Sequence, residues 1–191
     1  CIRDSDNGEI LRRFVGHLSP VQKVKWSNNT SLMVTSDASG VVIIWNFNTG
    51  ELLHSFQLSS ENGVTAIAVT PDSTRLLIGS LDGDIVVYVV STGELIYSWK
   101  ANFGVADAAF VSGSTEVLLT NIVSTTAIYE VSDGEIQQEI PISSSLFVWI
   151  LSKSNNALIS DLSGRLFMWD FDLGQIVRTM DAHTNPVAAV A

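Results

Sequence analysis

The stretch Trp45-Asn-Phe-Asn-Thr-Gly50-Glu51 decides the fold, because the chain repeats its pattern at a nearly fixed distance. In each copy an aromatic residue is followed five positions later by Gly, then by an acidic or amide residue and an apolar strand. Further copies end at Gly93-Glu94, Gly134-Glu135 and Gly174-Gln175, and a partial copy ends at Gly8-Glu9. The five glycines are separated by 42, 43, 41 and 40 residues. Such self-similarity is typical of a repeat architecture.

Each repeat predicts four β-strands. In the first repeat, Val41–Trp45 is apolar throughout and predicts a strand buried on both faces. Two more strands precede it, at Val21–Trp26 and Leu32–Thr35. After each glycine, apolar and polar residues alternate, which predicts a half-buried strand near an outer edge. The connectors are rich in Gly, Ser, Asn and Asp, which suit tight turns. The chain is therefore predicted to be all-β, built from four-stranded antiparallel meanders.

A single meander cannot bury both faces, but copies stacked around an axis can, as in a β-propeller. The chain resembles the WD40-repeat β-propellers, whose period is about 40 to 45 residues. Gly16-His17 and His183 resemble the Gly-His that opens a repeat, and Trp45-Asn46 and Trp169-Asp170 resemble the Trp-Asp that closes one. The resemblance covers nearly the whole chain.

We expect one propeller segment with four full blades and partial blades at both ends. The expected divisions are 1–15 for the end of a preceding blade, 16–57, 58–100, 101–140 and 141–180 for repeats one to four, and 181–191 for the start of the next. Closed rings of this family usually have seven blades, which would need roughly 300 residues. The chain is thus expected to belong to a seven-bladed or larger propeller. An open arc capped by a partner is the alternative.

The resemblance implies a structural tetrad in each blade. It joins the His, a Ser or Thr eight residues before the Trp, an Asp six residues before it, and the Trp itself. These positions hold His17, Asp37, Ser39 and Trp45 in the first repeat; Ser60, Ser80, Asp82 and Tyr88 in the second; Ala101, Asn121, Val123 and Tyr129 in the third; and Asp161, Ser163 and Trp169 in the fourth. The Ser and Asp are reversed in the first and fourth repeats. We therefore expect no complete tetrad, with apolar packing between blades contributing most of the stability.

Catalytic and metal sites are not expected. His17, Asp37 and Ser39 have the residue types of a hydrolase triad, but a structural network in a blade is the preferred interpretation and no Gly-x-Ser-x-Gly motif is present. Three histidines and the single Cys1 offer no zinc-ligand spacing. Asp82-Gly83-Asp84 is similar to a calcium loop, yet the other ligand positions are missing and a β-turn explains it. No Gly-rich phosphate loop appears. We expect a protein that is not an enzyme and uses no metal and no cofactor.

The charge and the cysteine content indicate which classes of partner and which cellular compartment to expect. Ten basic and 20 acidic residues give a formal charge of −10, which argues against a broad nucleic-acid surface. The one candidate for a basic patch comprises Arg12, Arg13, Lys23 and Lys25, which we interpret as solvated strand faces. A single cysteine favours a reducing, intracellular location, either cytoplasm or nucleus. The apolar runs are strand-sized, so no membrane span is expected.

The resemblance implies a rigid platform that binds several proteins at one face of the ring, around the central channel. The candidate partner-binding residues lie near the starts of the inner strands and in the turns before the third strands: Gln22, Lys23, Ala38, Leu81, Phe103, Asp107 and Leu162. Trp26, Trp99 and Trp149 are expected in the core. The first hypothesis is a non-catalytic scaffold or adaptor in a multiprotein complex. The alternative is a sensor or regulatory propeller attached to an enzyme, such as a kinase or a nucleotide-hydrolysing switch protein.

Overall fold

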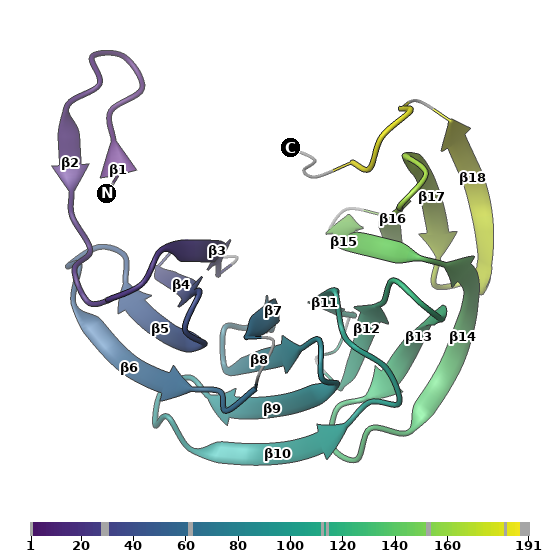
Figure 1. Cartoon of the computed structure of the whole chain (residues 1–191), viewed down its shortest axis with the longest axis horizontal. Helices are drawn as coiled ribbons and strands as arrows, with labels where there is room; N and C mark the ends of the chain where they lie inside the picture. The colour runs from purple at the N-terminus through teal and green to yellow at the C-terminus, as the bar shows by residue number, and fades with distance from the viewer. Residues whose placement is uncertain are drawn as a thin grey trace.

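Four sheets of four antiparallel strands follow one another along an open arc (Figure 1). The computed structural model describes residues 2–27, 31–60, 63–111, 113, 115–151, 154–181 and 183–187. The first blade contains β3 (Val21–Trp26), β4 (Leu32–Asp37), β5 (Val41–Asn46) and β6 (Leu52–Gln57); the second β7 (Val64–Val69), β8 (Arg75–Ser80), β9 (Asp84–Val89) and β10 (Leu95–Lys100); the third β11 (Asp107–Phe110), β12 (Glu116–Thr120), β13 (Thr125–Glu130) and β14 (Ile136–Ser143); and the fourth β15 (Ser145–Leu151), β16 (Asn156–Asp161), β17 (Arg165–Asp170) and β18 (Gln175–Asp181). The predicted all-β, four-stranded blades are confirmed.

The strand order within each blade matches chain order, so each blade is a meander with its first strand innermost. The inner strands β3, β7, β11 and β15 contact one another in sequence. The outer strands β6, β10, β14 and β18 show mixed exposure, because one face packs on a neighbour and the other meets solvent. No helix among the described residues is long and apolar enough to cross a bilayer.

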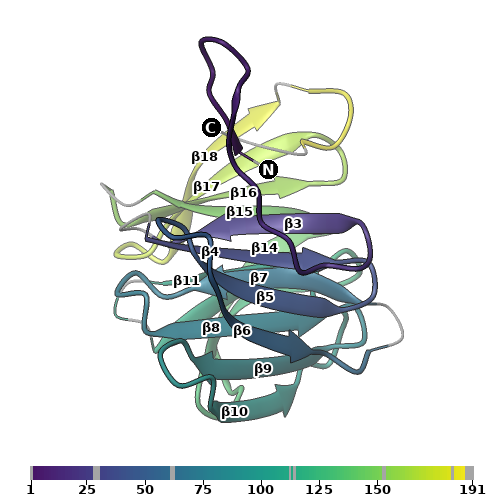
Figure 2. The same ribbon diagram turned by 90° about the vertical axis from the view of Figure 1, so that its left-hand side faces the viewer.

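The apolar core lies between blades. Ile44 of the first blade and Ile78 of the second are both almost completely buried in one cluster. Leu77 and Leu119 belong to the cluster between the second and third blades, and Ile140 and Ile159 to the one between the third and fourth. Each sheet therefore buries a face by stacking on its neighbour, which positions the inner strands relative to one another (Figure 2).

The half-buried strand expected after Gly8 is shorter than the strands that follow the other repeat glycines. Only β2 (Ile10–Arg12) is a strand, and it pairs with β1 (Ile2–Arg3) in a separate two-stranded sheet. The strand ends before Phe14, whose ring packs edge-on against Trp45 with centroids 5.5 Å apart. An inner strand after His183 was also predicted. Residues 183–187 form no strand, and residues 188–191 lie outside the described part.

Candidate functional site

A hydrogen-bonded network of four side chains braces the first blade. Trp45 Nε1 donates to Thr35 Oγ1 at 2.8 Å, and Thr35 Oγ1 lies 2.6 Å from His17 Nε2. His17 Nδ1 lies 2.7 Å from Asp37 Oδ2. A carboxylate only accepts, so Nδ1 carries the proton and a neutral imidazole accepts the Thr35 hydroxyl proton at Nε2. The chain of donors runs from Trp45 through Thr35 and His17 to Asp37.

This network corrects the expectation that no blade has a complete tetrad. The hydroxyl is Thr35, ten residues before Trp45, and the carboxylate is Asp37, eight residues before it. Residues two apart on a strand share a face, so Thr35 and Asp37 of β4 both meet His17. Ser39, which was assigned the acidic position, instead donates to Asp37 Oδ1 at 2.7 Å.

The same geometry removes the triad interpretation of His17, Asp37 and Ser39. Both ring nitrogens of His17 are engaged, one by Asp37 and the other by Thr35. No hydrogen bond between Ser39 and His17 is found in the described part of the chain. A serine nucleophile needs the imidazole within hydrogen-bond reach, so this arrangement is structural.

Burial acts to raise the pKa of Asp37, but hydrogen bonds from Ser39, His17 and the Val41 amide outweigh it and lower the pKa. In the fourth blade, burial also acts to raise the pKa of Asp161, whereas hydrogen bonds from Ser163 and Arg165 lower it. Both carboxylates are therefore stabilised in the charged form.

The other blades keep only parts of the network. In the fourth blade, Arg165 Nη2 lies 2.8 Å from Asp161 Oδ2, so a guanidinium contacts the carboxylate that the His17 imidazole contacts in the first blade. Ile159 stands ten residues before Trp169, and Trp169 Nε1 has no hydrogen-bond partner among the described residues. In the second blade Ser60 donates to Asp82. In the third, the expected positions of Ala101, Val123 and Tyr129 contribute no such bridge in the described residues.

One position closes the turn between the second and third strands of every blade. It is held by Asp37, Ser80, Asn121 and Asp161, each buried. The side-chain oxygen accepts backbone N–H groups of the turn; the donors, in blade order, are Ser39 and Val41, Asp82 and Asp84, Val123 and Ser124, and Ser163 and Arg165. These are local side-chain-to-backbone bonds that replace ladder bonds at the turn.

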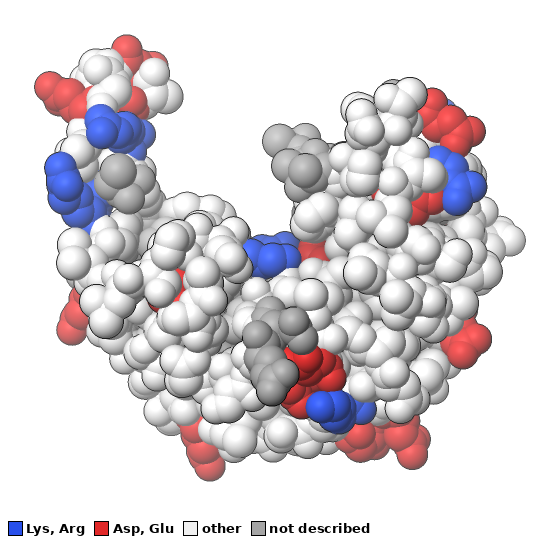
Figure 3. Space-filling model, viewed as in Figure 1, with Lys and Arg blue, Asp and Glu red and all other residues white. Residues whose placement is uncertain are grey.

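Two of the predicted partner-binding residues meet on the inner surface, together with a third residue. Lys23 and Lys25 of β3 lie close to Asp107 of β11. Lys25 Nζ lies 3.8 Å from Asp107 Oδ1, and Lys23 Nζ donates to the Ala106 carbonyl at 3.4 Å. We call Lys23, Lys25 and Asp107 the inner lysine cluster. Charged side chains of both signs meet at the inner edge of the arc in Figure 3.

The inner lysine cluster is poorly hydrated. Asp107 is 2% exposed, and burial raises its pKa while Lys25 and Lys23 oppose the rise. Burial lowers the pKa of Lys23, an effect that Asp107 opposes and Lys25 reinforces. Asp107 Oδ2 accepts the Val148 amide at 3.3 Å, whereas Oδ1 has no hydrogen-bond partner among the described residues. Two lysines thus share one buried carboxylate, which leaves an excess of positive charge.

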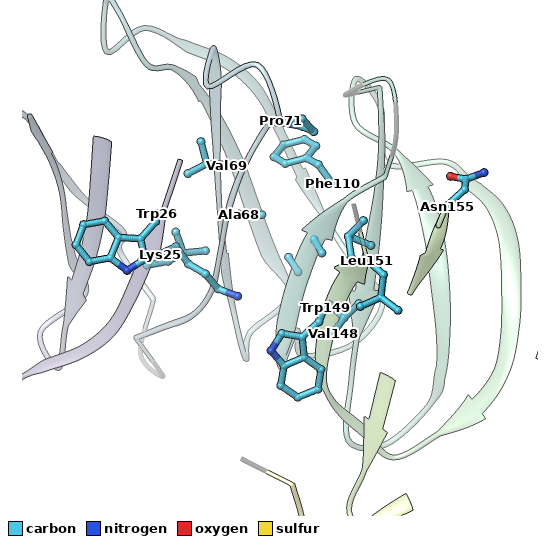
Figure 4. Close-up of a pocket in the computed structure, with 14 residues that line it drawn as sticks. Lys25, Trp26, Ala68, Val69, Pro71, Phe110, Val148, Trp149, Leu151 and Asn155 are labelled. Carbon is cyan, nitrogen blue, oxygen red and sulfur yellow. The ribbon is translucent and has the colours of Figure 1, made fainter. Parts of the chain in front are cut away.

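A cavity of ≈ 670 Å³ lies beside this cluster (Figure 4). It is lined by the last residue of each inner strand, namely Trp26, Val69, Phe110 and Leu151, with Lys25 and Trp149 among the others. Of the predicted residues, Gln22, Ala38, Leu81 and Leu162 lie at the opposite end, where the inner strands start and the turns before the third strands lie. The sequence prediction therefore missed this end of the inner surface.

The remaining predicted partner-binding residues have different environments. Gln22, Ala38, Leu81 and Leu162 are exposed, as a contact surface requires. Phe103 is half-buried and packs edge-on against Tyr129 with centroids 6.3 Å apart, so it supports the core between two blades. Gly16 packs close to Trp45, and His183 is exposed.

The tryptophans are not all in the core as expected. Trp26 is 45% exposed, and its ring packs edge-on against Phe47 at 4.8 Å. Trp149 is half-buried and lines the cavity, whereas Trp99 stacks on Tyr129 at 5.5 Å. One sequence pattern points to the missed end of the inner surface. Lys23 and Lys25 alternate along an inner strand, which places both lysines on one face next to Trp26.

Comparison with known proteins points to one family. The family model "WD domain, G-beta repeat" matches residues 8–46 and 50–88. The WD repeat-containing protein WDS homolog of Arabidopsis thaliana is 31% identical over 101 residues, which cover 52% of this chain and 19% of that protein. The COMPASS component SWD3 of Saccharomyces cerevisiae is 22% identical over 206 residues, covering 95% of this chain and 65% of that protein.

Two further similarities concern a subunit and a fold. Eukaryotic translation initiation factor 3 subunit I of Aspergillus oryzae is 36% identical over 77 residues, covering 40% of this chain and 22% of that protein. The β-propeller domain of Cps50 (Swd1) from Myceliophteria thermophila superposes with a TM-score of 0.77 at 11% identity, over 91% of this chain and 58% of that one. This chain spans less than two thirds of the length of each of these relatives. The two matched repeats, the WD-repeat relatives and the four-stranded blades support the WD40-repeat β-propeller family for this chain.

Proposed function

We propose that this chain is a non-catalytic platform that binds other proteins within a multiprotein complex. The observation that carries the proposal is the inner surface, where the inner lysine cluster and a preformed cavity lie on strands held by buried interfaces between blades. Rigid strands present side chains at fixed positions, so a partner binds without first ordering the surface.

The relatives support the same role. Two of them are named as a component or a subunit of an assembly, namely the COMPASS component and the initiation factor subunit. They favour an adaptor over the alternative of a sensor propeller attached to an enzyme.

We assign the first partner contacts to the exposed residues at the starting end of the inner strands, Gln22, Ala38, Leu81 and Leu162. Leu81 and Leu162 are 40% and 44% exposed and occupy the same turn in two blades. Exposed leucines on a rigid turn are suited to pack against a partner. The single cysteine favours a reducing, intracellular setting for this role.

The test isolates the tagged full-length protein at native abundance under mild conditions. Size-exclusion chromatography with light scattering gives the mass, and mass spectrometry identifies proteins in stoichiometric amounts. We expect a complex, which Leu81→Glu with Leu162→Glu dissociates. Leu95→Glu is the matched control, because Leu95 is 49% exposed but lies on the outer strand β10. Recovery of a partnerless monomer would overturn the proposal.

A further inference from the structure

The cavity beside the inner lysine cluster is built for a chain with apolar side chains. Its lining includes the small residues Ala68 and Ala109 together with Phe110 and Trp149. Figure 4 shows the Lys25 side chain directed from β3 toward Trp149, whereas the Trp26 ring points away from Lys25. Small residues leave depth, and the Trp149 indole supplies flat apolar area at low conformational cost. An aromatic or aliphatic side chain placed against Trp149 would exchange water for apolar contact.

Charge selects among apolar occupants. Lys25 is the only charged side chain among the described residues that line the cavity. Its ammonium lies 3.8 Å from Asp107 Oδ1, which is too long for a hydrogen bond, so its donors remain available. The Lys25 side chain is 35% exposed. Lys23 adds a second positive charge behind it, over the Phe147 ring at 5.7 Å from the centroid.

The buried carboxylate of Asp107 does not neutralise this charge. One Asp107 carboxylate faces two lysines, and its single negative charge balances only one of them. The rest of the chain is strongly acidic, with a formal charge of −10, which disfavours an extended polyanion such as nucleic acid. A single carboxylate carried on an apolar segment satisfies both the local positive charge and the apolar walls.

We propose that this cavity is a docking site for an extended peptide segment in which an aspartate or glutamate is flanked by apolar residues. The carboxylate accepts hydrogen bonds from the Lys25 ammonium, and an apolar side chain packs against Trp149. This inference rests on the proposed function, since it names a class of partner for the inner surface. It places the contact at the finishing end of the inner strands, opposite the residues Leu81 and Leu162.

A displayed library of random peptides, selected on the full protein, tests the site. Enriched peptides are then synthesised, and their affinity is measured for the unmodified protein and for Lys25→Gln, Trp149→Ala and Lys100→Gln. Lys100 lies on the outer strand β10, and its Nζ is 3.3 Å from Asp84 Oδ1. It is the matched control, because it is a paired lysine far from the cavity. Circular dichroism and thermal unfolding establish that each variant is folded.

We expect peptides that combine acidic with aromatic or aliphatic residues. Their affinity should fall roughly tenfold in Lys25→Gln, as for loss of a charge-assisted hydrogen bond, and should weaken with added salt. Trp149→Ala should also weaken them, and Lys100→Gln should not. Enrichment of basic peptides, absence of enrichment, or equal binding to Lys25→Gln would overturn the site. If no acidic peptide is enriched but the isolated complex persists in Lys25→Gln, the docking site is wrong and the platform role stands.

Discussion

Thr35 Oγ1 accepts the indole proton of Trp45 at 2.8 Å, and this contact is the centre of the brace in the first blade. The fourth blade has the same indole at Trp169, but Ile159 occupies the position of the hydroxyl. The two blades thus form a natural comparison between a satisfied and an unsatisfied buried donor.

Thr35→Val should destabilise the chain by about 1–3 kcal/mol, because it leaves Trp45 Nε1 and His17 Nε2 without their shared partner. Urea unfolding followed by fluorescence measures the change. Thr179→Val on the exposed outer strand β18 is the control and should change stability by less than about 0.5 kcal/mol. Equal effects would mean that the brace contributes nothing.

Ile159→Thr should cost less stability than Ile78→Thr. Both isoleucines are almost fully buried and stand ten residues before the aromatic residue of their blade. The new hydroxyl at 159 gives Trp169 Nε1 an acceptor, whereas the blade of Ile78 has Tyr88 in place of the Trp. Urea unfolding of the two variants measures the difference, and a larger loss of stability in Ile159→Thr than in Ile78→Thr contradicts the prediction.

Gly134→Ala should be more destabilising than Gly8→Ala, although both glycines have a similar positive φ, 77° and 74°. The left-handed conformation costs each alanine roughly 1–2 kcal/mol. At Gly134 an added Cβ would also lie 2.5 Å from the Trp99 ring, whereas nothing lies within 4 Å at Gly8. Thermal unfolding of the two variants should therefore give a clearly lower midpoint for Gly134→Ala, and equal midpoints would refute the close approach.

Asp37 should make stability depend on acid pH. Its folded-state pKa is lowered below the ordinary value of 3.8, so it contributes stability above that value, and the contribution is lost as pH falls through the lower folded value. Asp37→Asn should be less stable than the unmodified protein at neutral pH, with the difference shrinking in acid. Ser39→Ala removes one hydrogen bond to Asp37, so the contribution should be smaller and its loss should be complete at a higher pH. Identical acid profiles for Asp37→Asn and the unmodified protein would contradict this account.

Much of the fold follows from the sequence, because period, turn glycines and strand alternation are local patterns. The strand bounds of β3 match the prediction, and β5 differs by one residue. The site depends on contacts between repeats, which local patterns do not carry. Lys25 of the first blade meets Asp107 of the third across a separation in sequence that local patterns do not report. The Thr35 hydroxyl lies ten residues before Trp45, not at the eight-residue offset of the family pattern.

The buried residue that closes the turn before each third strand has a wider consequence. Asp37, Ser80, Asn121 and Asp161 differ in charge and size, yet each offers an oxygen to the same kind of backbone donor. What the turn requires is an acceptor in a fixed place, and several amino acids meet that requirement. Substitutions can therefore remove the family's sequence pattern from a repeat while the blade keeps its fold. This agrees with the match of the family model to two stretches of a chain that folds into four blades.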